Sequence, residues 1–201
     1  MRHQNYLRIS LAYLSSILLV LFLIPLFANA DSVYGVGAYG NCYYSICNNQ
    51  TITISSLGAV NLNLQFTNPS ACAAGSDNVT VSTNAVNGYT LFINSLNSGS
   101  LLTGASSISP INAIGSSPIS LTSNTWGYRV DGWAGFGSTP SNYLTATYGA
   151  VPNGGSLDRI ATVSSAVNNS TTIVWYGLCA NTTLPSGSYS DTIIYTAATN
   201  P

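Results

Sequence analysis

Apolar and polar residues alternate one by one along much of the chain beyond residue 50. The clearest case is residues 60–66, where Val60, Leu62, Leu64 and Phe66 are separated by Asn61, Asn63 and Gln65. Because successive side chains of a β-strand point to opposite faces, this spacing predicts an amphipathic strand. Comparable patterns rich in β-branched and aromatic residues predict further strands from residue 79 onward and at 51–54, 89–93, 125–130, 160–163, 171–179 and 188–197.

Short turn motifs separate these runs. Asn87-Gly88 predicts a hairpin turn before residues 89–93, and Asp131-Gly132 predicts a two-residue type I′ hairpin between residues 125–130 and 133–136. Residues 94–120 are rich in Ser and Gly, which predicts loops with short strands. About 8–10 short strands and no helical repeat predict an all-β fold. We expect a single antiparallel β-sandwich over residues 51–201, immunoglobulin-like or jelly-roll in outline.

Residues 1–30 have the three parts of a secretory signal peptide. Arg2 and Arg8 give a basic start, residues 11–27 are mostly apolar and form the expected signal helix, and Ala28-Asn29-Ala30 has the small residues that signal peptidase recognises. An uncleaved membrane anchor is the alternative, since this run approaches the length of a membrane span. Residues 31–50 are expected to form a flexible arm and a small disulfide loop. The protein is therefore expected outside the cell, secreted or at the cell surface.

The chain beyond residue 30 contains no Lys, no Glu and no His. Its charged residues are Asp31, Asp77, Arg129, Asp131, Asp158, Arg159 and Asp191. General acid–base catalysis draws mainly on His, Glu, Asp and Lys, and a His-activated nucleophile cannot be built from this part of the chain. Zinc sites based on His and a basic groove for nucleic acid are excluded in the same way. We therefore expect a protein that is not an enzyme and needs no cofactor or metal.

All four cysteines follow the apolar N-terminal run, which agrees with an oxidising compartment. Cys42 and Cys47 enclose only four residues, so their pairing would close a tight loop. Cys72 then pairs with Cys179 and ties an early loop to a late strand, which is one of three possible connectivities. A four-cysteine metal site is the alternative, but Cys72 and Cys179 lack the paired spacing that such sites use.

The predicted hairpin concentrates aromatic side chains around one charged pair. Its candidate ligand-contact residues are Trp126, Tyr128, Arg129, Asp131, Trp133 and Phe136. Aromatic rings flanked by hydrogen-bonding groups suit the stacking and binding of a sugar ring. Core packing is the alternative, because Trp126, Tyr128 and Val130 share one face of a strand. Trp133, next to the turn, is the best candidate for exposure.

Three parts of the sequence carry a resemblance to known proteins. They are residues 34–42 (YGVGAYGNC) with Cys47, residues 87–91 (NGYTL) with 124–132 (NTWGYRVDG), and residues 174–177 (VWYG) with 185–192 (PSGSYSDT). Together they resemble a family of secreted surface proteins of Saccharibacteria-type bacteria, which brings no established activity. Residues 185–192 are also similar to the end of the spore coat protein U group, which includes chaperone–usher pilins. That resemblance implies an immunoglobulin-like fold and polymerisation through an N-terminal arm, although residues 31–40 lack the apolar alternation of a donated strand.

A structural or adhesive role outside the cell is the leading hypothesis. The expected partners are envelope or host-cell surface components, or further copies of the chain in a surface layer or pilus-like filament. The second hypothesis is a carbohydrate-binding module that uses residues 126–136. The weakest is a glycoside hydrolase with Asp131 and Asp158 as paired carboxylates, since a turn and an adjacent Arg explain both residues. Nucleic acid is not an expected partner, and membrane contact is expected only through an uncleaved N-terminal segment.

Overall fold

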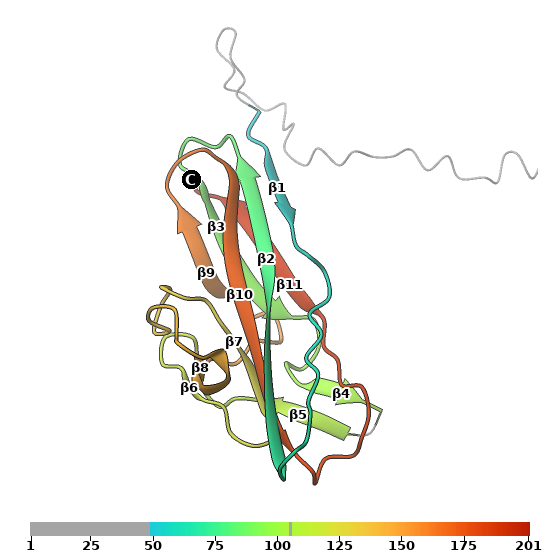
Figure 1. Ribbon diagram of the computed structural model, residues 1–201. Helices are drawn as coiled ribbons and strands as arrows, with labels where there is room; N and C mark the ends of the chain where they lie inside the picture. Colours follow the sequence, from blue (N-terminus) through green and yellow to red (C-terminus); the bar gives the residue numbers. More distant parts are fainter. Residues whose placement is uncertain (1–48, 105) are drawn as a thin grey trace, which may run out of the picture. The chain divides into compact units, whose positions relative to one another are not determined.

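The computed structural model describes residues 49–104 and 106–201, and its Gln50–Pro201 part is an all-β unit (Figure 1). Within these residues the only helix is the short 3-10 helix η1 (Tyr143–Thr145), so none could cross a membrane. The expected signal peptide, flexible arm and Cys42–Cys47 pair lie outside the described residues. The strands are β1 (Ile52–Ser55), β2 (Ser70–Thr83), β3 (Tyr89–Ser95), β4 (Leu101–Thr103), β5 (Ser106–Pro110), β6 (Ile119–Ser120), β7 (Thr125–Arg129), β8 (Thr147–Tyr148), β9 (Asp158–Val163), β10 (Val167–Asn181) and β11 (Ile193–Thr199).

The described strands form three sheets. The first has the order β1-β2-β10-β7-β5-β4, the second β11-β3-β9, and a small third sheet pairs β6 with β8. The expectation of purely antiparallel pairing is wrong for β5 and β7, which run parallel with Ser109 opposite Thr125. Parallel neighbours need a crossover connection rather than a tight hairpin, and residues 111–124, which include β6, provide it.

The longest strands, β2 with 14 residues and β10 with 15, pair with each other along most of their length. Figure 1 shows them side by side along the unit. Cys72 and Cys179 face each other in this ladder with their Cα atoms 4.1 Å apart, and the predicted disulfide between them is confirmed. Cys72 does not lie in a loop, as the sequence suggested, because β2 begins at Ser70 rather than near residue 79.

Residues 60–66 do not form the predicted strand, although their faces follow the predicted alternation. Val60, Leu62 and Leu64 are half-buried against the main core, and the polar residues between them are exposed. Methyl groups of Val60 and Leu62 lie 3.0 Å from the point that a Cβ at Gly75 of β2 would occupy. The alternation therefore reports which side of the segment is buried, whereas backbone pairing depends on a neighbouring strand that the pattern does not specify.

Both larger sheets contribute side chains to one hydrophobic core. Its buried members include Val81 of β2, Leu91 of β3, Ile160 of β9 and Val174 of β10. The turn predicted at Asn87-Gly88 is present, since Gly88 has a φ of 73° and its N–H donates to Ala85 O at 2.9 Å. It does not form a hairpin, however, because β2 and β3 belong to different sheets. The turn carries the chain from one sheet to the other.

The hairpin predicted around Asp131-Gly132 is absent. Residues 130–136 form two successive turns, in which Trp133 N–H donates to Val130 O at 3.2 Å and Phe136 N–H donates to Trp133 O at 3.1 Å. Gly132 and Ala134 have φ values of 73° and 50°, which are incompatible with an extended strand. The chain therefore coils after β7, and this coil places Trp133 on the surface beside β9.

Candidate functional site

Three of the predicted contact residues lie in the core instead of on a binding platform. Trp126, Tyr128 and Phe136 are 3%, 1% and 4% exposed. The indole Nε1 of Trp126 donates to Gly99 O at 2.8 Å, and its ring lies 6.4 Å from that of Tyr176. Tyr128 and Phe136 meet edge to face at 5.3 Å. The core-packing alternative is therefore correct for these three aromatic residues.

The predicted charged pair is engaged inside the protein. Arg129 is 2% exposed, and its Nε donates to Asp131 Oδ1 at 2.5 Å. The guanidinium also donates to Ser138 O at 2.6 Å and to Thr147 O at 3.3 Å. On its other side, Asp131 accepts a hydrogen bond from the hydroxyl of Tyr143 at 2.5 Å. Arg129 and Asp131 thus fasten the segment that follows β7 and are not free to bind a ligand.

Tyr143 and Tyr148 pack on the face of β7 and β10 that points away from the main core. The Tyr143 ring stacks on Trp175 with 3.5 Å between ring centres, and Tyr148 donates its hydroxyl to Tyr143 O at 2.8 Å. Burial, assisted by the hydrogen bond to Asp131, raises the pKa of Tyr143 to about 12. Burial likewise raises the pKa of Tyr148 to about 12, against the lowering effect of Arg129. Both hydroxyls therefore remain protonated donors near neutral pH.

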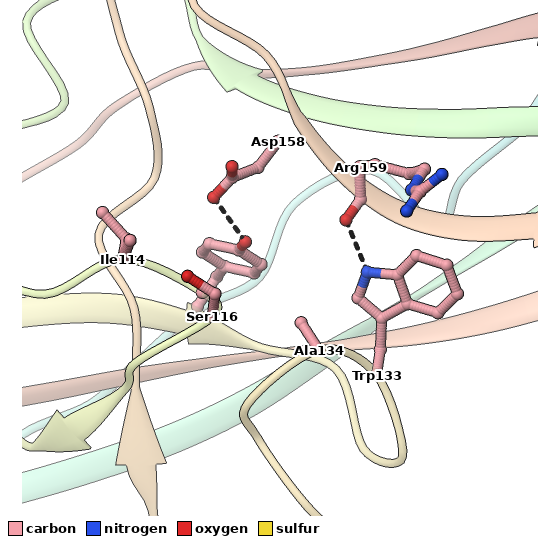
Figure 2. A pocket seen from close by; sticks show the side chains of 8 residues that line it. Ile114, Ser116, Trp133, Ala134, Asp158 and Arg159 are labelled. Carbon is pink, nitrogen blue, oxygen red and sulfur yellow. Dashed lines mark hydrogen bonds between the residues drawn. The ribbon is translucent and has the colours of Figure 1, made fainter.

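Trp133 is the one aromatic side chain of the predicted set that is partly exposed. Its Nε1 donates to Arg159 O at 2.5 Å, and the Arg159 guanidinium carbon lies 5.4 Å from the centre of its ring (Figure 2). Beside it the surface forms a hollow of about 440 Å³. The hollow is lined by Ile114, Gly115, Ser116, Tyr128, Trp133, Ala134, Asp158 and Arg159.

Tyr128 links the core to this hollow. Its hydroxyl donates to Asp158 Oδ2 at 2.8 Å, and Figure 2 draws this bond as a dashed line to the Asp158 carboxylate. Gly115 leaves room for it, since a Cβ there would lie 2.6 Å from the hydroxyl oxygen. Burial first, and then the neighbouring Asp158 carboxylate, raise the pKa of Tyr128 far above its usual range. The phenol therefore stays a hydrogen-bond donor that fixes one carboxylate oxygen.

Sequence reasoning missed Ile114, Ser116 and Arg159 as neighbours of Trp133. Ile114 and Ser116 come from the Ser-rich segment between β5 and β6, and Arg159 comes from the start of β9. Nothing in the local pattern of these segments marks them as neighbours. The only signal was the charged dipeptide Asp158-Arg159, which stands out in a chain with so few charges.

The carboxylates considered for hydrolysis belong to separate hydrogen-bond networks. Asp131 accepts from Arg129 and Tyr143, whereas Asp158 accepts from Tyr128 and alone of the two lines the hollow. The remaining described carboxylates also have internal partners. Asp77, only 2% exposed, accepts from Leu57 N–H at 2.8 Å, and Asp191 accepts from Ser95 Oγ at 2.6 Å. Each described aspartate side chain thus accepts a hydrogen bond from within the fold, and those of Asp77, Asp158 and Asp191 connect residues far apart in the sequence.

In residues 49–104 and 106–201, no three His, Cys, Asp or Glu side chains converge as metal ligands would. Comparison of the chain with protein-family models, curated proteins and solved structures found no match.

Proposed function

We propose that the chain is a secreted or envelope-associated, non-catalytic protein with a structural or adhesive role, such as a subunit of a surface layer or filament. The observation that carries this proposal is that the charged side chains are hydrogen-bonded within the fold. Asp77, Asp158 and Asp191 accept hydrogen bonds from residues 20 or more positions away in the sequence. Asp131 accepts from Tyr143, and Arg129 is buried against it. Groups held in this way stabilise a shape, and they are poorly placed to exchange protons with a substrate.

Secretion is proposed from the N-terminal sequence and from the disulfide. Residues 1–30 have the pattern of a signal peptide, and a Cys72–Cys179 bridge persists in the oxidising compartments outside the cytosol. The exposed surface relies on Ser, Thr and Asn for its polarity, with two Arg and no Lys beyond residue 30. The resemblance to secreted surface proteins of Saccharibacteria-type bacteria supports the same placement.

The finer architecture that we propose is a single β-sandwich of immunoglobulin-like or jelly-roll outline. Two observations support it: strands of both larger sheets contribute to one core, and the connections from β2 to β3 and from β10 to β11 each join strands of different sheets. Such connections are usual where two sheets pack face to face. A crystal structure with β2 and β3 paired in one sheet would contradict this architecture.

Surface exposure of the protein on intact native cells tests the leading proposal. Antibody against the folded unit should label unpermeabilised cells, and protease added outside should remove the signal while a cytosolic marker survives. Purified full-length protein should sediment with isolated envelope material or form higher-order assemblies. A Cys72→Ser/Cys179→Ser variant serves as the control with a weakened fold. Strictly monomeric protein without affinity for envelope material or host cells would refute the proposal.

Carbohydrate binding is the second candidate, and the partly exposed Trp133 beside the hollow favours it. The residues that would bind the sugar differ from those predicted, because most of the predicted platform is buried. A glycan array probed with full-length protein tests this candidate, and the absence of any saturable binding would remove it. A glycoside hydrolase gains no support, since Asp131 and Asp158 have different partners.

A further inference from the structure

The hollow beside Trp133 contains polar atoms that the fold does not use. Asp158 Oδ2 accepts a hydrogen bond from the Tyr128 hydroxyl, while Asp158 Oδ1 has no hydrogen-bond partner among the described residues. Within the same part of the chain, the Ser116 hydroxyl also has no partner, and Ser116 is exposed. A carboxylate oxygen, a hydroxyl and a partly exposed aromatic ring thus line the same hollow (Figure 2).

The ring itself is held in place. The bond from Trp133 Nε1 to Arg159 O fixes the edge of the indole, and the Arg159 guanidinium lies over the ring. A ring whose N–H is already satisfied offers a ligand mainly its apolar surface. Ile114, which is 64% exposed, adds a second apolar wall.

We propose that this hollow binds a neutral hexopyranose residue of a glycan, with the sugar ring against Trp133 and its hydroxyls bound by Asp158 and Ser116. This inference rests on the second candidate function. One face of a pyranose consists largely of C–H groups, which pack on an aromatic ring, while its hydroxyls need acceptors such as a fixed carboxylate oxygen. The volume of about 440 Å³ falls within the range of roughly 300–1,000 Å³ of small-molecule sites.

The charges of the hollow select a neutral ligand. Asp158 and Arg159 are opposite in sign and both line the hollow, so it carries no net charge that would favour an acidic or a basic sugar over a neutral one. A nucleotide is a poorer fit, because its phosphates need several cations. The described residues offer only Arg129, which is buried, and Arg159.

Titration of the full-length protein with simple sugars tests this site. The probes are the methyl glycosides of glucose, mannose, galactose and N-acetylglucosamine, with glucuronic acid and glucosamine as charged counterparts. Binding is followed by tryptophan fluorescence and by saturation-transfer NMR. Trp126 is buried and Trp175 stacks on Tyr143, and a fluorescence change that disappears in Trp133→Ala is assigned to Trp133. We expect saturable binding of at least one neutral sugar, and binding of both charged sugars that is at least about fivefold weaker.

Variants locate the binding. Trp133→Ala should weaken it at least about tenfold, and Asp158→Asn, which can still accept from Tyr128 but turns a donor toward the ligand, at least about fivefold. Ser116→Gln fills the hollow from an exposed position, so it tests the site even if Trp133→Ala does not fold. Phe66→Ala, which removes a 45% exposed aromatic ring elsewhere, is the matched control and should bind normally.

These experiments separate two hypotheses: that the protein binds carbohydrate, and that it does so in this hollow. Glycan-array binding that survives Trp133→Ala and Ser116→Gln would overturn the hollow as the site and leave carbohydrate binding standing. No binding on the array would remove both. Tighter binding of a charged sugar than of any neutral one would overturn the proposed ligand class.

Discussion

Gly127 of β7 and Gly177 of β10 lie directly opposite each other in the ladder, and the Tyr148 side chain packs against both, with its Cβ beside Gly127 and its ring against Gly177. A methyl group at Gly177 would overlap the Tyr148 ring and lie 2.8 Å from Leu121. At Gly127 it would lie 2.5 Å from Gly149 O. The two glycines therefore leave a depression in the sheet, through which a fully buried tyrosine joins the layer containing β6, β8 and η1 to the main sheet.

Replacing Gly177 by Ala should destabilise the fold by about 1–3 kcal/mol, because the added methyl group overpacks the contact with Tyr148. Gly75→Ala is the control, since it adds the same group to β2 of the same sheet. There the methyl group meets only side-chain methyls of Val60 and Leu62, at 3.0 Å, which can shift. Urea denaturation of the three proteins measures the difference. Equal losses at the two positions would show that Tyr148 is not what makes Gly177 necessary.

Local features of the fold could be predicted from the sequence, whereas the pairing of distant segments could not. Alternation at residues 60–66 identified the buried side correctly, and Asn87-Gly88 identified a turn, because both depend on neighbouring residues. Which strand pairs with which depends on packing between distant segments, so neither the missing ladder at residues 60–66 nor the change of sheet at Gly88 could be anticipated. The hollow has the same origin, because Ser116 and Arg159 come to line one surface only in the folded protein.

The aromatic residues show a second limit of sequence reasoning. Alternation placed Trp126 and Tyr128 on one face of a strand, but it does not say whether that face is core or surface. Two sheets contribute to the core here, so the inward face of β7 is covered and its aromatic residues are buried. Trp133 remains partly exposed because the chain coils at Gly132 and Ala134. The sequence predicted a hairpin at this point.

Removal of the Cys72–Cys179 disulfide should lower the free energy of unfolding by about 2–5 kcal/mol. The bridge joins residues 107 apart in sequence, so the reduced unfolded chain gains much conformational freedom. The measurement is denaturant unfolding of Cys72→Ser/Cys179→Ser against the parent. Substitution is preferable to a reducing agent, which would also act on Cys42 and Cys47. A loss below about 1 kcal/mol would show that the bridge restricts the unfolded chain far less than a loop of this length implies.

Replacing Arg129 by Met should destabilise the protein by about 3 kcal/mol, because Asp131 and two carbonyl oxygens lose their charged donor. Adding Asp131→Asn to this variant should recover part of the loss, since it removes the carboxylate charge left without a partner. Thermal and denaturant unfolding near pH 7 compare the single and double variants. A double variant less stable than Arg129→Met alone would show that the charge on Asp131 is well tolerated without Arg129.

Alkaline pH should unfold the protein through its buried tyrosines. The half-buried Tyr143 and the buried Tyr148 have pKa values raised to about 12, chiefly by desolvation, whereas in the unfolded chain their pKa lies near the usual tyrosine value of about 10. Between about pH 10 and pH 12 the unfolded state therefore binds fewer protons than the folded state, and the free energy of unfolding falls as the pH rises. The buried Tyr148 contributes a slope of up to about 1.4 kcal/mol per pH unit. The more exposed Tyr143 contributes a smaller slope because solvent screens its interactions, and below about pH 9 neither contributes.

Tyr143→Phe tests this assignment. It lowers stability at neutral pH by removing the hydrogen bond to Asp131, but it should also flatten the alkaline slope by the contribution of one tyrosine. Denaturant unfolding at several pH values between about 8 and 11.5 gives both slopes, and ultraviolet absorption of tyrosinate follows ionisation in the same samples. An unchanged slope in Tyr143→Phe would mean that Tyr143 ionises in the folded protein as readily as in the unfolded chain, so that the other buried tyrosines account for the alkaline transition.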